Sequence, residues 1–312
     1  MTAKVFIDGE AGTTGLQIQA RLKERRDLSL LTIDAAYRKD PAARADVLNA
    51  ADLVILCLPD EAAREAVALI KTPSVKVIDA STAHRVEPAW VYGFPECAPG
   101  RRAEIAEANR VANPGCWSTG AIGLLAPLVR GGLVPADWPV TISGVSGYSG
   151  GGKSMIAEFE QGGGGPPHRI YATGLEHKHV PEIAAQAGLT HRPLFAPAVG
   201  RYYKGMIVEI PLQLSALPAQ PQLADIHDCL ADAYAGQSFI EMAKPSEAAA
   251  LTTLAPEGLN GTNQMRLHVF GSERHRQARL VALLDNLGKG ASGAAVQNLN
   301  LMLGLPETAG LV

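Results

Sequence analysis

Short apolar runs alternate with segments of helical pattern along the first eighty residues, and this alternation constrains the fold more than any other feature. The runs cover residues 4–8, 28–33, 52–58 and 75–80. The third run is apolar almost throughout, which is typical of a parallel strand covered on both faces. Strands that alternate with helices in this way predict an α/β fold built on a parallel sheet.

A glycine-rich turn separates the first apolar run from the first helical segment. Its spacing is GxxGxxG, not the GxGxxG of many dinucleotide folds, and such turns also occur for geometric reasons alone. Its place directly after the first strand favours a Rossmann-type site, in which phosphate lies at a helix N-terminus. The residues predicted to bind a nucleotide cofactor here are Gly9, Gly12, Thr13, Thr14 and Gly15.

Further candidates follow the later strands. Ligands of parallel sheets gather beyond the carboxyl ends of the strands, which places Pro59, Ser81 and Arg85 on one rim with the glycine-rich turn. We expect Pro59 and Ser81 to contact the cofactor. Arg85 is either a surface ion-pair residue or an anion-binding residue, and its place on the rim favours the second.

The residues after the second strand bear on which cofactor is bound. Asp34 stands where an acidic residue would hold a ribose hydroxyl of NAD. Arg38 and Lys39 follow, and they would bind the additional phosphate of NADP. All three can also be solvated loop charges, so these residues alone leave the choice open.

Cys116 follows a Pro-Gly turn and precedes an apolar segment, residues 121–129, that reads as a helix. Unpaired amides at a helix N-terminus favour negative charge, so a thiol there is biased towards the nucleophilic thiolate. The alternative is a buried small hydrophobic residue, the usual role of a free cysteine. This segment alone favours neither.

The second half of the chain changes character after about residue 135 and predicts an α+β domain. A glycine- and proline-rich stretch, residues 161–167, predicts an irregular loop. Strands are predicted over 140–147, 194–199, 206–214, 265–270 and 278–284, and helices over 182–187, 223–235 and 291–303. The closing strand and helix would rejoin the first domain and bring Asn286 near the cofactor.

A second reactive cluster reads His177-Lys-His179-Val-Pro-Glu182. A histidine serves as acid and base near neutral pH, and a nearby carboxylate orients it. His179 and Glu182 are three residues apart, close enough to interact at the start of a helix. A lone histidine is more often a surface or capping residue, but a cysteine nucleophile elsewhere favours the catalytic interpretation.

Composition narrows the function classes. The chain has 312 residues, which favours two domains, and 47% hydrophobic residues, which suits a globular protein with a large core. A net charge of −3 argues against nucleic acid as the main partner. No apolar run is long enough to cross a bilayer, the first residues lack the parts of a signal peptide, and the four cysteines have neither zinc-site nor disulfide spacing. We therefore expect a cytoplasmic protein without a membrane partner or a bound metal.

A nucleotide cofactor, a cysteine at a helix start and a histidine on a separate domain suit hydride transfer through a thioester; cysteine peptidases share the Cys/His pair but have no use for a dinucleotide fold. In this combination the chain resembles the short form of the N-acetyl-γ-glutamyl-phosphate reductases of arginine biosynthesis. The segments that carry the resemblance are 9–15, 113–116, 143–147, 177–182 and 285–298.

The resemblance implies a glyceraldehyde-3-phosphate-dehydrogenase-like architecture, NADP(H), and a homo-oligomer, either a tetramer or a dimer. It implies a dinucleotide-binding domain over residues 1–115, a catalytic and oligomerisation domain over 116–284, and a C-terminal segment, 285–312, that returns to the first domain. It also implies reductive dephosphorylation of an acyl phosphate, with Cys116 as nucleophile, His179 as acid and base, and Glu182 as its orienting partner.

The same resemblance suggests residues for the anionic groups of the substrate. These are Arg85, Asn113, Ser149 and Arg201, with Lys153 and Lys204 as further candidates. Residues 79–85 depart from the longer form of the family in the neighbours of the arginine. Two alternatives stay open: a reductase of aspartyl or N-acetylaminoadipyl phosphate, and a nucleotide-binding redox regulator without turnover.

Overall fold

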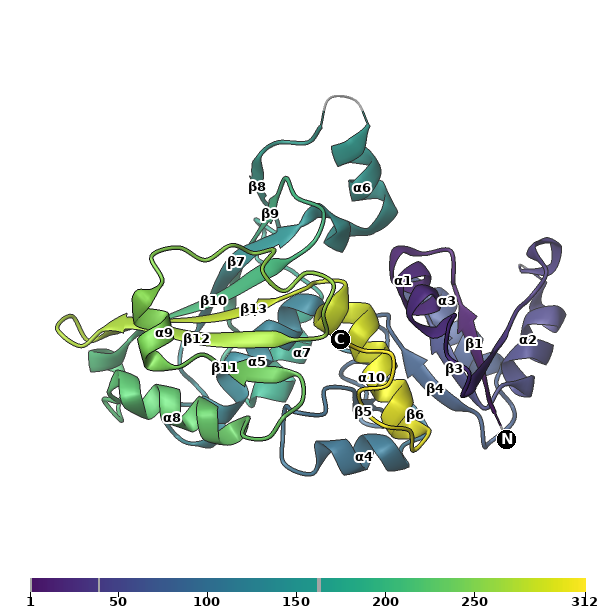
Figure 1. Cartoon of the computed structure of the whole chain (residues 1–312), viewed down its shortest axis with the longest axis horizontal. Helices are drawn as coiled ribbons and strands as arrows, with labels where there is room; N and C mark the ends of the chain where they lie inside the picture. Colours follow the sequence, from purple (N-terminus) through teal and green to yellow (C-terminus); the bar gives the residue numbers. More distant parts are fainter. Residues whose placement is uncertain (1, 39, 162–163) are drawn as a thin grey trace. The chain divides into compact units, whose positions relative to one another are not determined.

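The computed structural model describes residues 2–38, 40–161 and 164–312, and within these the chain forms two compact units (Figure 1). Unit 1 comprises Met1–Pro95, Gly100–Gly115 and Ala291–Val312. Unit 2 comprises Glu96–Pro99 and Cys116–Gly290. Compared with the predicted domains, the short stretches 96–99 and 285–290 group with unit 2, because their hydrogen bonds and ion pairs are made there.

Unit 1 has an entirely parallel sheet of six strands in its described residues, in the order β2-β1-β3-β4-β6-β5. The predicted Rossmann-type sheet is thereby confirmed. Its strands are β1 (Ala3–Asp8), β2 (Leu28–Leu31), β3 (Leu53–Leu56), β4 (Lys76–Asp79), β5 (Val91–Tyr92) and β6 (Arg110–Ala112). Its helices are α1 (Thr13–Leu22), α2 (Pro41–Ala50), α3 (Asp60–Leu69), α4 (Arg101–Glu107) and α10 (Gly293–Met302), with a short 3₁₀ turn, η1 (Ala35–Tyr37).

Both faces of this sheet are covered, as the continuous apolar strands predict. Alternate side chains of β1 point to opposite faces: Val5 joins a core formed with α1 and α10, whereas Phe6 joins a core formed with α2 and α3. Every residue of β3 is buried. The C-terminal helix α10 contributes Val296 and Leu299 to the first core, so the end of the chain completes the unit that its beginning starts.

Unit 2 has a mixed sheet of seven strands in its described residues, in the order β11-β12-β13-β10-β7-β9-β8. Figure 1 shows the long antiparallel strands β10, β13 and β12 side by side. The strands are β7 (Thr141–Gly147), β8 (His168–Ile170), β9 (Leu194–Gly200), β10 (Met206–Gln213), β11 (Ile240–Met242), β12 (Met265–Ser272) and β13 (Gln277–Leu284). The helices are α5 (Cys116–Arg130), α6 (Gly152–Glu160), α7 (His179–Ala187), α8 (Leu223–Ala233) and α9 (Pro245–Ala250), with 3₁₀ turns η2 (Tyr148–Gly151) and η3 (Leu214–Ala216) and a π-helical turn, η4 (Gly288–Ser292), at its end.

Helix α5 is the buried centre of unit 2. Gly120 lets it approach the sheet, because a Cβ at that position would lie 2.7 Å from a methyl carbon of Val208. Pro127 lies inside the helix and cannot donate the usual hydrogen bond to the carbonyl of Gly123. The hydroxyl of Tyr234 donates to that carbonyl instead, at 2.7 Å. The helix therefore continues through the proline to Arg130.

Several predicted elements are confirmed with shifts of a few residues at their ends. The helix expected from residue 121 begins at Cys116, and the helix expected from residue 182 begins at His179. The segment expected as one helix over 291–303 starts with the π-helical turn η4 and continues as α10. Residues 162 and 163 of the predicted loop lie outside the described residues.

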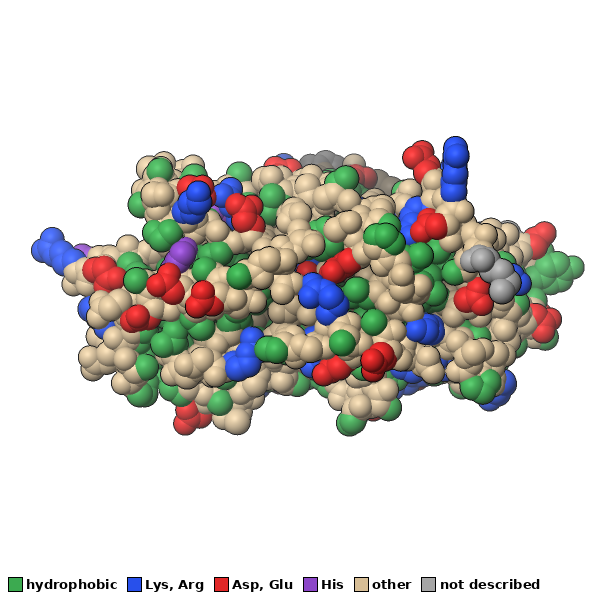
Figure 2. Space-filling view, turned by 60° about the horizontal axis from the view of Figure 1, so that its bottom comes forward, with side chains coloured by type: hydrophobic (Ala, Val, Ile, Leu, Met, Phe, Trp, Pro, Cys, Tyr) green, Lys and Arg blue, Asp and Glu red, His purple; other side chains and the backbone are tan. Residues whose placement is uncertain are grey.

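The distribution of charged side chains on the surface is consistent with the small net charge of the chain, −3. On the face drawn in Figure 2, acidic and basic side chains are interspersed. Among the described residues, none of the helices combines the length and the apolar character required to traverse a lipid bilayer.

Candidate functional site

The glycine-rich turn of unit 1 has a geometry that only glycine permits. Gly9 has φ = +87°, and a Cβ on it would lie 2.4 Å from the carbonyl oxygen of Cys57. A Cβ on Gly15 would lie 2.5 Å from the carbonyl oxygen of Gly9. The Gly12 N–H donates to the Gly9 carbonyl at 2.9 Å and closes the turn. The turn is therefore tight enough for its backbone to approach a pyrophosphate closely.

Helix α1 begins directly after this turn, at Thr13. Its N-cap is Gly12, which brings no side chain to cap the first amides. The backbone amides of this first turn, including those of Thr13 and Thr14, are the kind of group that binds anions at helix N-termini. The residues present thus suit the phosphates of a dinucleotide.

A cavity of about 360 Å³ opens beside the turn within unit 1. Two arginines stand at it, and each pairs with an acidic residue. Arg38 forms an ion pair with Glu10, and Arg44 forms one with Asp8 at 2.8 Å. Asp34 caps η1 by accepting from the Ala36 N–H at 2.9 Å. The cavity is lined by Phe6, Ile7, Asp8, Gly9, Glu10, Ala11, Ile33, Arg38, Arg44, Leu58 and Ala62.

These contacts bear on the choice between the two cofactors. Arg38 lines the cavity, and its role in binding the cofactor stays a prediction. Arg44 lines it too, and the sequence analysis missed this second cation because α2 was not predicted. Lys39 lies outside the described residues. The Asp34 carboxylate is used as a cap, which leaves it less suited to hold a ribose.

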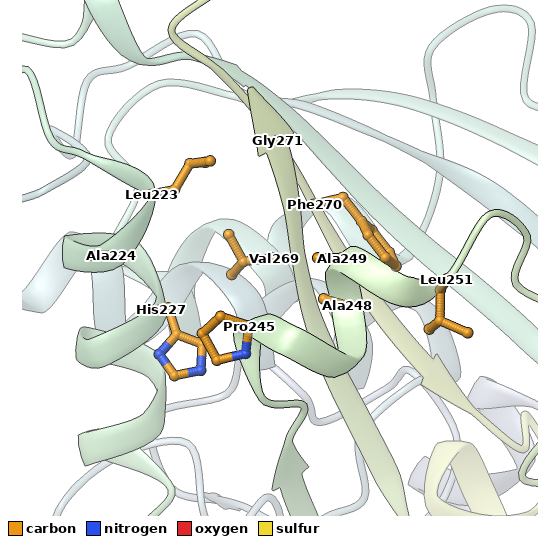
Figure 3. A pocket seen from close by; sticks show the side chains of 10 residues that line it. All are labelled: Leu223, Ala224, His227, Pro245, Ala248, Ala249, Leu251, Val269, Phe270 and Gly271. Atoms are coloured by element: carbon orange, nitrogen blue, oxygen red, sulfur yellow. The ribbon is translucent and has the colours of Figure 1, made fainter. Parts of the chain in front are cut away.

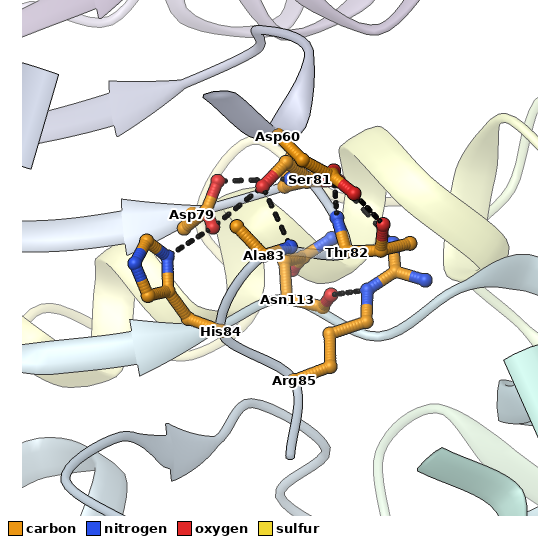
Figure 4. A network of polar contacts seen from close by, with 9 residues as sticks. Asp60, Asp79, Ser81, Thr82, Ala83, His84, Arg85 and Asn113 are labelled. Atoms are coloured by element: carbon orange, nitrogen blue, oxygen red, sulfur yellow. Dashed lines mark hydrogen bonds and ion pairs between the residues drawn. The ribbon is translucent and has the colours of Figure 1, made fainter. Parts of the chain in front are cut away.

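The carboxyl ends of β3 and β4 carry a polar network (Figure 4). Asp79 is fully buried and accepts from the Ser81 N–H at 2.9 Å, from the Ser81 hydroxyl at 2.7 Å, and pairs with Nδ1 of His84 at 2.6 Å. The His84 ring stacks on Trp90, with centroids 4.1 Å apart. A buried carboxylate is stable only when such donors surround it. The Ser81 hydroxyl is thus engaged within unit 1.

Pro59 and Asp60 stand at the start of α3, the neighbouring element. Pro59 is the N-cap residue, with extended backbone, and Asp60 accepts from the Thr82 N–H at 2.9 Å. This bond joins the loops that follow β3 and β4. Two of the loops on the rim predicted from the sequence are therefore connected.

Arg85 and Asn113, two predicted substrate residues, are buried in unit 1 and already bonded there. Arg85 Nε donates to the Asn113 carbonyl at 3.0 Å, and Nη2 donates to the Ala80 carbonyl at 3.2 Å. The Asn113 side chain donates to the Ala291 carbonyl and accepts from Asn298, both at 3.0 Å. These bonds hold the loop after β6 against the returning C-terminal segment.

Cys116 is the first residue of α5 in unit 2, and it is half-buried. The helix places its aligned amides at the thiol, which favours the thiolate. Gly290 packs against it, since a Cβ at position 290 would lie 2.7 Å from Cys116 Cβ. Burial raises the pKa of the Tyr171 phenol, the negative charge of a Cys116 thiolate adds to that rise, and a hydrogen bond with Trp117 opposes it.

The other cysteines have different surroundings. Burial, with the charges of Asp79 and Asp8, raises the pKa of Cys57 to about 12. Burial also raises the pKa of Cys229, and Cys97 is only 1% exposed. Cys116 thus stands apart as the partly exposed thiol at a helix start.

His179 begins α7, which packs against α5. Its Nε2 lies 3.9 Å from Glu182 Oε1 one turn along, and both side chains are buried. His177 accepts the His179 N–H at 3.2 Å through Nδ1 and so acts as a local cap. The sequence spacing therefore gives the predicted His179–Glu182 pair.

Aromatic rings surround these histidines. His177 contacts His179, Phe195 and Tyr171, with ring centroids 4.7, 4.8 and 5.8 Å apart. Trp117, the residue after Cys116, packs edge-on against Phe195 at 5.3 Å. This cluster ties the start of α5 to the start of α7. The sequence analysis did not name Tyr171 as part of this cluster, although Tyr171 lies only six residues before His177 in the sequence.

The remaining predicted residues also belong to unit 2. Asn286 donates to the Ser149 hydroxyl at 3.0 Å and accepts from the Gly205 N–H at 2.8 Å, which is why it groups with this unit. Arg201 is exposed, and its N–H donates to the Pro167 carbonyl. Lys204 pairs with Asp285 at 3.2 Å, and Lys153 is exposed on α6.

Unit 2 also contains a cavity of about 400 Å³ between α8, α9 and β12 (Figure 3). Its described lining is largely apolar and includes none of the predicted site residues. The lining residues are Leu223, Ala224, His227, Pro245, Ala248, Ala249, Leu251, Val269, Phe270 and Gly271.

Comparison with known proteins adds two family matches. Residues 4–107 match the family described as semialdehyde dehydrogenase, NAD binding domain. Residues 116–286 match the family described as semialdehyde dehydrogenase, dimerisation domain. The junction between the two matches falls just before Cys116.

Individual proteins are similar over almost the whole chain. The N-acetyl-gamma-glutamyl-phosphate reductase of Burkholderia cenocepacia is 57% identical over 308 residues, which cover 98% of each chain. Aspartate semialdehyde dehydrogenase II from Vibrio cholerae, solved with ASA, has a TM-score of 0.71 at 16% identity and covers 97% of this chain and 99% of its own. Aspartate semialdehyde dehydrogenase from Candida albicans, solved with NADP, has a TM-score of 0.65 at 14% identity, with 97% and 99% covered. At such identities the solved structures support the fold alone.

Proposed function

The chain belongs to the N-acetyl-gamma-glutamyl-phosphate reductase family, and we infer from its site that Cys116 carries the acyl group during the reaction of that family. The protein is an NADP-dependent oxidoreductase of arginine biosynthesis. It converts N-acetyl-L-glutamyl 5-phosphate to N-acetyl-L-glutamate 5-semialdehyde through a cysteine thioester. The observation that carries the residue assignment is the half-buried thiol at the start of α5, with a buried His–Glu pair at the start of the adjacent helix α7.

The first step uses Cys116. Its thiolate attacks the carbonyl carbon of the acyl phosphate, the bond from that carbon to the phosphate oxygen breaks, and inorganic phosphate leaves. A thioester on Cys116 remains. The amides of the first turn of α5 are donors for the negative charge that develops on the carbonyl oxygen, and each such donor is worth about 3–4 kcal/mol in a related case.

The second step uses His179. Bound NADPH supplies the hydride that reduces the thioester. His179 holds the proton that the tetrahedral oxygen receives, and it accepts that proton again as the carbon–sulfur bond breaks and the aldehyde forms. Glu182 orients the imidazole and stabilises its charged form.

Unit 1 binds NADP(H). We assign the pyrophosphate to Gly9, Gly12, Gly15 and the amides of Thr13 and Thr14. Arg38 is the proposed contact for the additional phosphate, since it stands at the cavity beside the turn. Pro59 and Ser81 remain predicted contacts from the neighbouring loops, as does Asn286 from unit 2.

The substrate is an acyl phosphate with a free carboxylate, so it needs cationic partners. Arg201 and Lys153 suit this role, because their side chains are exposed, whereas Lys204 already pairs with Asp285. Ser149 remains a proposed neutral contact. The bonds of Arg85 and Asn113 within unit 1 suit residues that shape the loops, and their direct contact with substrate stays a prediction.

We further propose that the protein works in the cytoplasm as a homo-oligomer, either a dimer or a tetramer. The match to a family described as a dimerisation domain supports association through unit 2. Light scattering coupled to size-exclusion chromatography measures the mass; a monomer at assay concentration would refute the oligomer.

The reaction is tested in reverse. The purified protein is given NADP, inorganic phosphate and N-acetylglutamate semialdehyde, and the absorbance of NADPH is followed; aspartate semialdehyde replaces the substrate in a parallel assay. We expect phosphate-dependent reduction of NADP with the first aldehyde at a far higher kcat/KM. Equal or better turnover of aspartate semialdehyde would reject the proposed substrate, and loss of phosphate dependence would reject the acyl-phosphate chemistry.

A further inference from the structure

Two opposite charges are buried together in unit 2. Lys289 Nζ lies 2.7 Å from Glu96 Oε1, and the two side chains are 1% and 0% exposed. The ammonium group also lies 5.5 Å from the centre of the Phe239 ring. Removing two charges from water is costly unless their pairing repays it, and apolar residues of similar volume often stabilise a fold equally or better. The pair therefore suggests a role beyond stability.

Lys289 stands one residue before the glycine that packs on the nucleophile. It belongs to the π-helical turn η4, a rare conformation that is frequent at functional sites. A Cβ on Gly290 would lie 2.7 Å from Cys116 Cβ and 3.2 Å from Cys116 Cα. The Gly290 N–H donates to the Asp285 carbonyl at 3.0 Å. A shift of this turn would therefore be transmitted directly to Cys116.

Glu96 lies on a segment that is itself fixed to α5. The next residue, Cys97, accepts a hydrogen bond through its carbonyl from Arg130 Nη1 at 3.2 Å. Arg130 is the last residue of α5, and Cys116 is the first. Residues 96–99 thus connect the far end of the helix to the turn that packs on its first residue.

We propose that the Glu96–Lys289 ion pair is a positioning device for Cys116: it holds η4 against the thiol so that the sulfur stays aligned with the first turn of α5. This inference rests on the proposed role of Cys116 as the nucleophile. The pair suits the task because its charge-assisted N–H···O hydrogen bond ties Lys289 to one carboxylate oxygen, whereas the hydrophobic effect is non-directional. Neither residue touches the substrate in this proposal.

The test removes the ion pair by a double substitution that should still allow the protein to fold. The double variant Glu96→Leu/Lys289→Met replaces both charges with apolar side chains of similar size, and Lys289→Arg keeps the charge. Gly290→Ala keeps the pair and pushes a methyl group onto Cys116. For each, kcat and KM are measured, together with the rate of iodoacetamide alkylation of Cys116 as a function of pH, located by peptide mass spectrometry.

In the double variant we expect kcat to fall about 100-fold, the usual effect of a displacement of about 1 Å, with KM for NADPH within about twofold of the wild type. Its alkylation profile should move to higher pH, because the thiol leaves the helix N-terminus. Lys289→Arg, which keeps the charge, should retain more of the wild-type kcat than the double variant does. Gly290→Ala should lose both turnover and alkylation.

The control is Arg102→Met, which breaks an ion pair with Glu307 in unit 1 and should change neither readout. A folded double variant with wild-type kcat and alkylation profile would overturn the inference, and so would a Gly290→Ala variant that behaves as the wild type. If the double variant fails to fold, Glu96→Gln/Lys289→Gln, which removes both charges and keeps polar side chains, is measured in its place, and wild-type kcat with a wild-type alkylation profile in that variant would overturn the inference. Cys116→Ser is assayed alongside: turnover in that variant would defeat the proposed function itself, separately from the role of the pair.

Discussion

His179 and Glu182 share the first turn of α7, with 3.9 Å between Nε2 and Oε1, and the backbone N–H of His179 donates to Nδ1 of His177 at 3.2 Å. The separation suits an interaction that tightens when the imidazole becomes charged. It also gives the two histidines different tasks. His177 caps the backbone of the turn, and His179 is oriented by the acid.

Replacing His179 with Asn should lower kcat by about 10²–10⁴-fold, the usual contribution of general acid–base catalysis. The pH profile of kcat should also lose one limb, since no group near neutrality replaces the imidazole. Glu182→Gln should have a smaller effect, because it orients the ring and transfers no proton. His177→Asn is the matched variant: if it proves the crippling change while His179→Asn is almost silent, the assignment of roles is wrong.

Replacing Cys116 with Ser should nearly abolish turnover and leave the affinity for NADPH close to that of the wild type, since a hydroxyl does not supply the anion at neutral pH. Iodoacetamide should inactivate the wild type and label Cys116 before the other cysteines. Cys57 should label last, because its pKa is raised to about 12. Peptide mass spectrometry at partial inactivation measures the order, and inactivation that follows Cys229 would contradict it.

The preference for NADPH over NADH should shrink in Arg38→Ala. A lost hydrogen bond to a charged group typically costs about 1.5–3 kcal/mol, so kcat/KM for NADPH should fall at least about tenfold while that for NADH stays the same. Arg64→Ala, an exposed arginine on α3, is the control. An equal loss for both cofactors in Arg38→Ala would mean that the arginine acts through the fold of the turn and its pairing with Glu10.

Gly9→Ala should destabilise unit 1 and weaken NADPH binding. The new Cβ would add left-handed strain of about 1–2 kcal/mol and would also collide with the Cys57 carbonyl oxygen at 2.4 Å. Gly100→Ala is the matched control in the same unit, because Gly100 has a similar φ of +81° and open space around it. Thermal unfolding and NADPH titration compare the two; equal losses would remove the collision from the explanation.

The free energy of unfolding should fall at acidic pH, in part because of His268. This histidine is a buried residue on β12, and its ring stacks on Phe270. Burial first, and the charge of Arg266 second, lower its pKa from 6.5, while Glu247 opposes this. The unfolded chain therefore binds the proton at a higher pH than the folded chain does. The contribution of neutral His268 to stability is therefore complete above pH 6.5 and is lost as the pH falls from that value through the lower pKa of the folded chain.

In His268→Leu this loss should be reduced. Urea unfolding midpoints at about pH 7.5 and about pH 5, on either side of the ordinary histidine pKa, should differ less in the variant than in the wild type. His191→Gln at an exposed position provides the control. An unchanged difference in His268→Leu would show that other groups account for the acid sensitivity.

The parts of the fold and site that the sequence predicted are local ones. The glycine-rich turn, Cys116 at a helix start and the His179–Glu182 spacing each depend on a few consecutive residues. Helices α2 and α4 were missed because each buries few residues, Leu48 in one and Ile105 in the other, so an apolar stripe hardly shows.

What the sequence did not predict depends on distant partners. Glu96 and Lys289 are 193 residues apart, and neither charge suggests its burial in isolation. The bonds of Asn113 with Ala291 and Asn298 likewise exist only after the C-terminal segment has returned to unit 1. Such pairs are set by tertiary packing, which residue spacing within one segment does not reveal.

The return of α10 to unit 1 has a consequence for the order in which a ribosome-bound chain can mature. Val296 and Leu299 fill the core beneath β1 and β3, so the nascent nucleotide-binding unit lacks part of its interior until residues 296–299 have been synthesised. Unit 2 is nearly continuous and is free to fold earlier, although domains generally fold from the N-terminus as they emerge. The half of the enzyme that is translated first is thus the half that is finished last.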